Sequence, residues 1–184
     1  MSSEDLASLI ADFPGALSEE ECRALIRLSE AAGFAPAIIE GKLDGPFGFT
    51  ALEGRNNLRA AIDDVQLSLT LWKRLERCAP AEIADRRVAG LNERLRFYRY
   101  DAGQNFGPHT DGCYARENGE RSLLTLMIYL NADFAGGETF FLQSEKLIAP
   151  ETGKALVFSH HLWHEGRPVT NGRKYILRTD VMYE

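Results

Sequence analysis

The sequence predicts one mainly β domain, a sandwich or jelly roll, with supporting helices in its N-terminal half. Two observations carry this prediction. Apolar residues follow a helical spacing before about residue 90 and alternate with period two after it. In the second half, short strand-like runs are separated by turn signals, with no helical pattern between them. The length of 184 residues, without an internal repeat or a linker, fits a single domain.

The composition is that of an ordinary globular chain. Hydrophobic residues make up 45% and charged residues 26% of the sequence, the usual balance for soluble domains. A net charge of −6 argues against a broad phosphate-binding surface, so no nucleic-acid partner is expected. The longest uncharged apolar run, residues 122–132, is too short to cross a bilayer, and acidic residues stand where a secretory signal would be basic. These features predict a cytoplasmic protein without a membrane partner and leave its oligomeric state open.

The three cysteines predict a reducing compartment. Cys22, Cys78 and Cys113 are odd in number and widely spaced, and no C-x-x-C pair occurs. Neither a disulfide framework nor a structural zinc site is therefore expected.

A first helix is predicted between Ser18 and Gly33. Ser18 followed by Glu21 forms a capping-box pattern, and Leu17 is placed to pack as a hydrophobic staple. Apolar residues then recur at helical spacing until the glycine supplies a stop.

A second helix is predicted at about residues 58–78. Apolar side chains recur there at steps of three and four residues, at Ile62, Val65, Leu69 and Trp72. A proline two residues beyond Cys78 agrees with a helix end at this point.

The segment between the two predicted helices, residues 41–55, has no clear period. It holds four glycines and Pro46. Long irregular segments in compact domains are usually functional loops or disordered. We therefore expect a lid or a substrate-contacting loop here, with a plain connection as the alternative.

Five strands are predicted after residue 90. They are rich in β-branched, aromatic and leucine residues and occupy residues 91–100, 122–130, 139–142, 154–159 and 174–182. Glycine-containing turn signals separate them. Many short strands without intervening helices are typical of a sandwich or jelly roll.

All four histidines fall in the strand half, and an H-x-D pair among them indicates a metal site. His109 and Asp111 are two residues apart, so in extended backbone they point to the same side and can reach one ion. A third ligand must come from elsewhere, and the run from His160 to His164 can supply it. Two histidines and one carboxylate with open positions are typical of non-haem Fe(II), and zinc accepts the same set.

Four segments of the second half match one known family in order and spacing. They are residues 96–111, which contain the H-x-D pair, and residues 126–131, 136–140 and 164–175. Together they resemble the prolyl 4-hydroxylase-like Fe(II)/2-oxoglutarate dioxygenases over about residues 91–184. The resemblance implies a double-stranded β-helix (a jelly-roll or cupin-like core) in residues 91–184. Residues 1–90 are then expected to form a helical support and the substrate loop of the same domain.

The resemblance also implies the ligand set. It makes His109, Asp111 and His164 the metal ligands and the catalytic centre, because the residues after His164 match the family pattern. His160 and His161 do not occupy the ligand position. They are expected to lie behind the ligands or on the surface.

The cosubstrate requires a cation, because a buried carboxylate without one is costly. The family places a lysine or arginine about ten residues after the distal histidine, and Lys174 matches that position. Strand alternation puts Arg178 on the same face as Lys174. Arg178 is therefore expected to share the 2-oxoglutarate carboxylate or bind an acidic substrate group, with an ordinary salt bridge as the alternative.

Several aromatic and polar residues are further candidates for the site. Tyr129 and Tyr100 match family positions near the cosubstrate. Tyr98 and Arg96 share a face with Tyr100, so they are expected at the pocket mouth, although core packing is the plain alternative for aromatics at period two. Candidate substrate contacts are Arg55, Asn57, Tyr98 and Arg96.

The reaction implied by the resemblance is hydroxylation of an unactivated C–H bond. It uses Fe(II), 2-oxoglutarate and O2, with ascorbate as a candidate reductant, and it releases succinate and CO2. The favoured substrate is a prolyl residue in a peptide or protein. The alternative is a free amino acid or a small natural product.

Two readings from other classes stay open. A zinc hydrolase could use the same ligands, but it needs a general base and the sequence has no H-E-x-x-H helix. A non-catalytic jelly-roll binding module is the other reading. Such a module has no reason to keep the H-x-D pair, His164 and Lys174 together.

Overall fold

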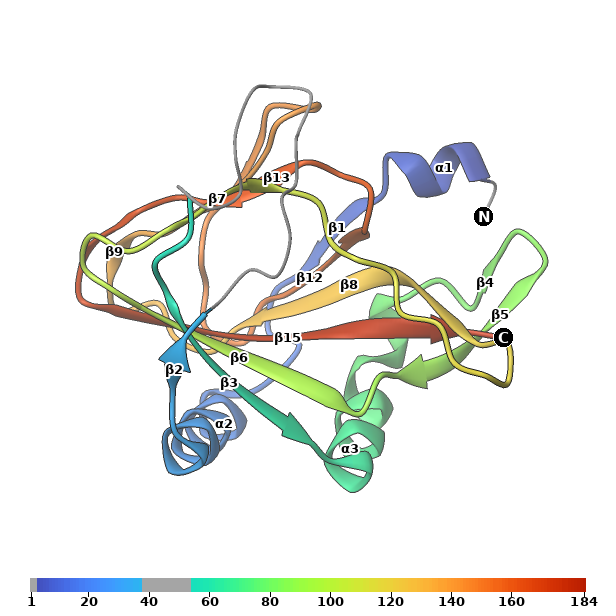
Figure 1. Ribbon diagram of the computed structural model, residues 1–184, viewed down its shortest axis with the longest axis horizontal. Helices are drawn as coiled ribbons and strands as arrows, with labels where there is room; N and C mark the ends of the chain where they lie inside the picture. The colour runs from blue at the N-terminus through green and yellow to red at the C-terminus, as the bar shows by residue number, and fades with distance from the viewer. Residues whose placement is uncertain (1–2, 38–53) are drawn as a thin grey trace.

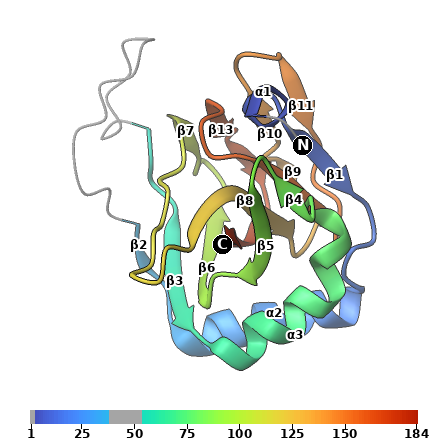
Figure 2. The same ribbon diagram turned by 90° about the vertical axis from the view of Figure 1, so that its right-hand side faces the viewer.

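A computed structural model describes residues 3–37 and 54–184 of the protein. Two β-sheets face each other, and the helices α2 (Glu19–Ala32) and α3 (Val65–Leu75) cover the outer face of the larger sheet (Figure 1). Figure 2 shows α2 and α3 on one side of the molecule and the smaller sheet on the other. Two short elements complete the helices, α1 (Ser3–Ala7) and the 3-10 turn η1 (Glu76–Cys78).

The larger sheet has nine strands within the described residues, and all of its pairs are antiparallel. Its main path runs β1-β12-β8-β15-β6-β3-β2, while β5 pairs with β15 and β4 pairs with β5. The strands are β1 (Ile10–Phe13), β2 (Ala35–Pro36), β3 (Leu58–Asp63), β4 (Glu82–Ile83), β5 (Arg86–Leu91), β6 (Arg94–Asp101), β8 (Arg121–Tyr129), β12 (Ala155–Ser159) and β15 (Arg173–Tyr183).

The smaller sheet has four strands in the order β11-β10-β13-β7. They are β7 (Phe106–His109), β10 (Thr139–Phe141), β11 (Lys146–Ile148) and β13 (His164–Gly166). A separate pair is formed by β9 (Ala135–Gly136) and β14 (Val169–Asn171). Two facing antiparallel sheets of this kind make the jelly roll, so the predicted mainly β fold with supporting helices is confirmed.

The larger sheet is buried on both faces, and strand alternation separates two apolar clusters. Phe97 and Leu177 point to the helices and join a cluster with the buried faces of α2 and α3. Their chain neighbours Tyr98 and Ile176 point to the smaller sheet and join a second cluster. The space between the sheets is therefore lined by the alternate residues of the central strands.

The first predicted helix is confirmed at both ends. Ser18 is the N-cap of α2: its Oγ accepts a hydrogen bond from the Glu21 backbone N–H at 3.2 Å, and a Glu21 carboxylate oxygen accepts from the Ser18 N–H at 2.7 Å. Gly33 ends the helix with a positive φ of 83°, a conformation that glycine adopts without steric cost.

The second predicted helix is wrong in its first part. Residues 58–63 form β3, which pairs with β6, and the helix starts only at Val65 after the N-cap Asp64. The spacing of apolar residues in this segment fits a helix locally, but pairing with β6 satisfies the backbone of six residues in the larger sheet. Tertiary pairing thus overrides local periodicity, and strands β1 to β5 come from the half that was expected to be helical.

The predicted strands of the second half agree with the structure within a few residues at each end. The exception is residues 91–100, where the chain forms the end of β5 and most of β6. The predicted loop at residues 41–55 lies outside the described residues except for its last two. No helix within residues 3–37 and 54–184 has both the length and the apolar character needed to cross a membrane.

Candidate active site

Strand pairing in the smaller sheet brings the H-x-D pair to the distal histidine. β7 and β13 are antiparallel, and His109 lies directly opposite His164 in their register. Asp111 follows β7, and its backbone N–H donates a hydrogen bond to the His160 carbonyl at 3.0 Å. The fold therefore gathers three side chains from two segments more than 50 residues apart in the sequence.

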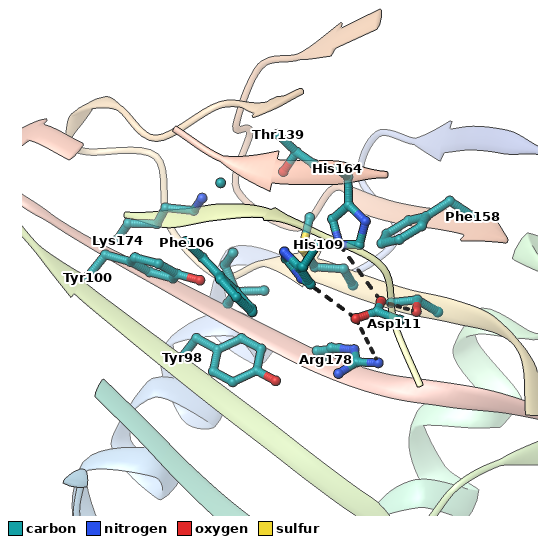
Figure 3. A pocket seen from close by; sticks show the side chains of 14 residues that line it. Tyr98, Tyr100, Phe106, His109, Asp111, Thr139, Phe158, His164, Lys174 and Arg178 are labelled. Carbon is teal, nitrogen blue, oxygen red and sulfur yellow. Dashed lines mark hydrogen bonds and ion pairs between the residues drawn. The ribbon is translucent and has the colours of Figure 1, made fainter. Parts of the chain in front are cut away.

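The three side chains can hold one metal ion. One ligand atom of each of His109, Asp111 and His164 lies within 4.8 Å of the others. The Nε2 atom of His109 is 3.8 Å from Asp111 Oδ1, and the Nε2 atom of His164 is 3.9 Å from Asp111 Oδ2 (Figure 3). Both histidines are buried, with 8% and 6% of their surface exposed.

Backbone contacts fix the orientation of both imidazoles. Nδ1 of His109 lies 2.9 Å from the Gly107 carbonyl, and Nδ1 of His164 lies 2.9 Å from the Leu162 carbonyl. Because a carbonyl can only accept, each Nδ1 carries the proton, and each Nε2 presents a lone pair to the metal position. Burial lowers the pKa of both histidines, which keeps the imidazoles neutral.

Asp111 is ionised and held from two sides. The guanidinium Nη2 of Arg178 lies 3.1 Å from Oδ1, and the Thr125 hydroxyl donates to Oδ2 at 2.5 Å. Burial alone would raise the pKa of this carboxyl, but the charge of Arg178 and the hydrogen bond from Thr125 lower it well below its usual range. Two neutral imidazoles and one carboxylate on one face are the donor set of non-haem Fe(II), so the residues fit that metal.

A cavity between the two sheets contains these ligands. The space that it encloses together with its open mouth is about 420 Å³. Fourteen residues line it: Tyr98, Tyr100, Phe106, His109, Asp111, Thr125, Met127, Thr139, Phe158, His164, Gly166, Lys174, Ile176 and Arg178.

Lys174 is a buried cation at the end of the cavity away from Asp111 (Figure 3). Only 1% of its surface is exposed, and its Nζ donates to the Gly137 carbonyl at 2.6 Å. Burial lowers the pKa of Lys174 to about 7, against a raising effect of the Glu138 charge. Among the described residues no carboxylate lies within ion-pair distance of Nζ. The remaining N–H groups of this ammonium can therefore take the carboxylate of a bound anion.

Arg178 lies on the same face of β15 as Lys174, as strand alternation predicts, but its charge is engaged. It lies 3.1 Å from Asp111 and 3.4 Å from Asp180, and Asp180 also pairs with Arg96 at 3.1 Å. The expectation that Arg178 shares the 2-oxoglutarate carboxylate stays a prediction, and the nearest anions to Arg178 among the described residues are protein carboxylates. The alternative of a salt bridge fits better, with a metal-ligand candidate as its partner.

The two candidate tyrosines occupy different layers. Tyr100 lines the cavity, and its ring centroid is 5.0 Å from the Lys174 Nζ. Tyr129 lies behind the cavity wall, where its hydroxyl hydrogen-bonds with the lining residue Thr139 at 2.6 Å. The Tyr129 ring is also near Lys174, with its centroid 5.5 Å from Nζ, so the cosubstrate contact expected for both tyrosines stays a prediction.

The candidate substrate contacts differ in whether they line the cavity. Tyr98 lines the cavity, and although burial raises the pKa of its hydroxyl, the charges of Arg178 and Arg55 lower it on balance. Arg55 stacks over the rings of Tyr98 at 5.0 Å and Phe106 at 4.1 Å, and one of its terminal nitrogens is buried without a hydrogen-bond partner among the described residues. Asn57 is buried and supports Arg55 by accepting from its Nε at 2.8 Å.

Arg96 was expected at the mouth of the pocket, and this expectation is wrong. It does not line the cavity, because its guanidinium is paired with the buried Asp180. The sequence pattern gives the face of β6 correctly but not the partner that draws a long side chain away from the cavity.

Residues on β8 were missed, although a signal for them existed. Thr125 and Met127 line the cavity, and they share the strand face of Tyr129, which was identified as a candidate. Alternation from Tyr129 would have indicated both. Nothing in the local sequence indicates Phe106, whose ring stacks on that of His109 with centroids 3.5 Å apart.

The neighbouring histidines have different environments. His160 is buried, and burial lowers its pKa to about 4 against the raising effect of Asp111. Its two nitrogens contact Thr125 and Ser122. His161 is exposed. The structure therefore places His160 behind the ligands and His161 on the surface, the two positions expected for them.

Residues 95–179, which contain this site, match the sequence model of the 2OG-Fe(II) oxygenase superfamily. The matched segment spans less than half of this chain. A curated relative from Acanthamoeba polyphaga mimivirus, named "Putative prolyl 4-hydroxylase", is 34% identical over 102 residues. That alignment covers 46% of this chain and 42% of the relative, so the matched part is less than half of the viral protein.

Several solved structures share the fold of this chain. The viral collagen prolyl hydroxylase of Paramecium Bursaria Chlorella virus-1 has a TM-score of 0.65 at 22% identity and covers 94% of this chain and 95% of its own. A Pseudomonas putida prolyl-4-hydroxylase has a TM-score of 0.65 at 20% identity, with 97% and 95% covered. A Trichoplax adhaerens prolyl hydroxylase has a TM-score of 0.67 at 18% identity, with 94% and 82% covered. The recognition of a prolyl 4-hydroxylase-like chain is thus confirmed.

Proposed function

We propose that the protein is an Fe(II)- and 2-oxoglutarate-dependent oxygenase that hydroxylates an unactivated C–H bond and releases succinate and CO2. One observation carries the proposal. A single cavity holds two neutral histidines and a carboxylate at one end and a buried lysine without an anionic partner among the described residues at the other. A metal together with a chelating dicarboxylate requires both features.

His109, Asp111 and His164 would hold the iron, and Lys174 would hold the far carboxylate of 2-oxoglutarate. The bound iron and cosubstrate supply the oxidising chemistry, as cofactors do in general. The backbone carbonyls keep the two Nε2 atoms unprotonated, and Arg178 and Thr125 keep Asp111 ionised and oriented. The aromatic walls formed by Phe106 and Phe158 limit access of water to the ligand end of the cavity.

The proposed substrate is a prolyl residue in a peptide or protein. The names of the mimivirus relative and of the similar structures support this, and the Trichoplax adhaerens enzyme is described in complex with a peptide fragment. The aromatic walls of the cavity suit a ring without polar groups. Arg55 has a buried nitrogen without a partner in residues 3–37 and 54–184, and it would bind a carbonyl of such a peptide.

The same arginine favours a second candidate, a free amino acid or a small natural product with a carboxylate. Arg55 could pair with that carboxylate as well as with a peptide carbonyl. Substitution Arg55→Met separates the two. It should raise KM about equally for all peptides if the contact is a carbonyl, and should selectively abolish use of substrates with a free carboxylate otherwise.

The alternatives from other classes have less support. A zinc hydrolase needs a general base, but among the described residues that line the cavity the only histidines and carboxylates are the three ligand candidates. A binding module would not need a buried lysine beside the ligands, since burying an unpaired ammonium lowers stability. The proposal includes a cytoplasmic location, which the unpaired cysteines support, and ascorbate as reductant.

Anaerobic calorimetric titration of 2-oxoglutarate into the Fe(II)-loaded protein tests the proposal. We expect binding that requires the metal, and succinate formation once O2 and a prolyl peptide are added. A metal-free sample is the control. Absence of binding to a folded, iron-loaded protein would contradict the proposed reaction class.

A further inference from the structure

A continuous chain of hydrogen bonds runs from Asp111 into the interior of the protein. Thr125 Oγ1 lies 2.5 Å from Asp111 Oδ2, and His160 Nδ1 lies 2.9 Å from the same Thr125 oxygen. On the other side of the ring, Ser122 Oγ lies 2.9 Å from His160 Nε2 and accepts a bond of 2.8 Å from the Tyr114 backbone N–H. The three linking side chains are at least 98% buried.

The direction of every hydrogen bond in this chain follows from its two ends. An ionised Asp111 can only accept, so the Thr125 hydroxyl donates to it. Since the Thr125 hydroxyl has only one proton and donates it to Asp111, its oxygen can only accept from His160. His160 Nδ1 therefore carries the proton. At the other end Ser122 accepts from Tyr114 and has its own hydroxyl proton to give to His160 Nε2. The chain is thus complete with one neutral tautomer of His160.

The opposite tautomer would break the chain. A proton on Nε2 would make His160 Nδ1 an acceptor, and the Thr125 proton would be drawn to the ring. Asp111 and Thr125 would then face each other at 2.5 Å without a proton between them, which is repulsive for two oxygens. The geometry therefore assigns a defined role to His160 that a histidine filling core space would not have.

We infer that His160 is a positioning residue for the metal site, which holds the Asp111 carboxylate in its ligand orientation through Thr125. The inference rests on the metal site of the proposed function. His160 holds Asp111 at two points, because its carbonyl also accepts the Asp111 backbone N–H. Arg178 forms an ion pair with the other carboxylate oxygen, Oδ1, and brings a full positive charge. The hydrogen-bond chain through Thr125 and His160 is neutral, so it orients Oδ2 without adding charge to the site.

Nitrogen NMR of the imidazoles in the unchanged, metal-free protein tests the tautomer. We expect the His160 ring to carry its proton on Nδ1 and a bare Nε2. The signals are assigned by their loss in His160→Asn and their retention in His161→Asn, which changes the exposed neighbour. A proton on Nε2 would overturn the inference, and this measurement does not depend on any variant being active.

Titration with Co(II), followed by visible absorption, tests the positioning role without turnover. Thr125→Val removes the hydrogen bond donated to Asp111, and His160→Leu removes the one that His160 donates to Thr125. Both variants should weaken Co(II) binding roughly 10- to 100-fold. Thr125→Ser keeps the hydroxyl, and His160→Asn keeps an N–H near the Nδ1 position, so both should bind Co(II) close to wild-type affinity. His161→Asn is the matched control and should bind as the wild type does.

The outcomes distinguish the inference from the proposed function. Unchanged Co(II) affinity in folded Thr125→Val and His160→Leu would overturn the positioning role while leaving the metal site intact. Equal losses in Thr125→Val and Thr125→Ser would also overturn it, because the hydroxyl would then not be the cause. No Co(II) binding by the wild-type protein would contradict the metal site itself, and the NMR result would still decide the hydrogen-bond chain.

Discussion

The buried Lys174 and the half-buried Arg178 are both cations on one face of β15, but they have different partners at the two ends of the cavity. Arg178 has two carboxylates within 3.4 Å, those of Asp111 and Asp180. Lys174 has only the Gly137 carbonyl as a close partner that the structure describes. Proximity to Asp111 contributes to raising the pKa of Arg178, while burial lowers that of Lys174 to about 7.

Arg178 is thus paired by the protein itself, whereas Lys174 has no anion in the described protein and would be paired by a bound ligand. A buried ion pair with further hydrogen bonds is complete and orients its members. A buried ammonium that only a carbonyl satisfies is costly, and it gains most when an anion binds. The metal end of the cavity is thus organised by the protein itself, and the Lys174 end is organised by what binds there.

Loss of one metal-ligand residue should abolish metal binding and turnover. His164→Ala and His109→Ala each remove one of three donors, and the loss of metal affinity should exceed the roughly 100-fold seen for residues behind ligands. Fe(II) titration and succinate formation measure this. His161→Ala is the control, and turnover at wild-type rate in either ligand variant would refute the triad.

Arg178→Gln should destabilise the metal-free protein by roughly 3–5 kcal/mol, because the buried Asp111 carboxylate then loses its cationic partner, whereas Asp180 keeps its ion pair with Arg96. Bound Zn(II) should recover part of this loss, since the ion neutralises Asp111. Urea unfolding with and without Zn(II) provides the comparison. Equal destabilisation in both states would show that Arg178 does not act on the metal end.

Lys174→Met should weaken 2-oxoglutarate binding roughly 10- to 100-fold, as expected for loss of a charged hydrogen bond of about 1.5–3 kcal/mol. Metal affinity should stay within about threefold, because the lysine lies at the other end of the cavity. Lys73→Met, at an exposed lysine, is the matched control. A loss of metal affinity with unchanged 2-oxoglutarate binding would reverse the assignment of the two ends.

The same variant should show a pH-dependent gain in stability when metal and cosubstrate are absent. The pKa of Lys174 is lowered from 10.5 to about 7 on folding, so between these values the unfolded chain binds more protons than the folded one. Its contribution to the free energy of unfolding therefore rises with pH over this window. The advantage of Lys174→Met over wild type should be largest below about pH 7 and shrink toward pH 10.5 in urea unfolding. A gap that does not change with pH would mean that Lys174 is not desolvated.

The smallest effects concern the tyrosines near Lys174. Tyr129→Phe removes only the bond to Thr139 and should cost about 1 kcal/mol of stability, with little change in KM for 2-oxoglutarate. Tyr100→Phe changes a cavity wall and should raise that KM more than Tyr129→Phe does. The reverse order would place Tyr129, rather than Tyr100, in contact with the cosubstrate.

Local patterns predicted the elements whose stability is local. The capping box at Ser18 and Glu21 satisfies backbone groups within four residues, so the start of α2 follows from the sequence. Residues 58–63 were expected to be helical from the local spacing of their apolar residues. Their backbone partner, β6, lies more than 30 residues away in the sequence. Their conformation is decided by that partner, which no window of the sequence contains.

Period two predicted which side chains share a face, and it did so at the site. Lys174, Ile176 and Arg178 all line the cavity. The same rule could not say which anions they meet, since those come from other segments of the chain. Arg96 shows the limit most clearly: its face was expected correctly, but Asp180 takes its charge away from the cavity mouth.

The sequence by itself determined the mainly β fold, the first helix and the residue types for a metal and a carboxylate ligand. Tertiary structure alone decided the pairing of His109 with His164, the engagement of Arg178 and the place of His160 in the hydrogen-bond chain. The physical reason is range. Capping and side-chain alternation act between residues close in the chain, whereas hydrogen bonds and ion pairs of buried groups depend on distances of about 3 Å between segments that only the packed sheets bring together.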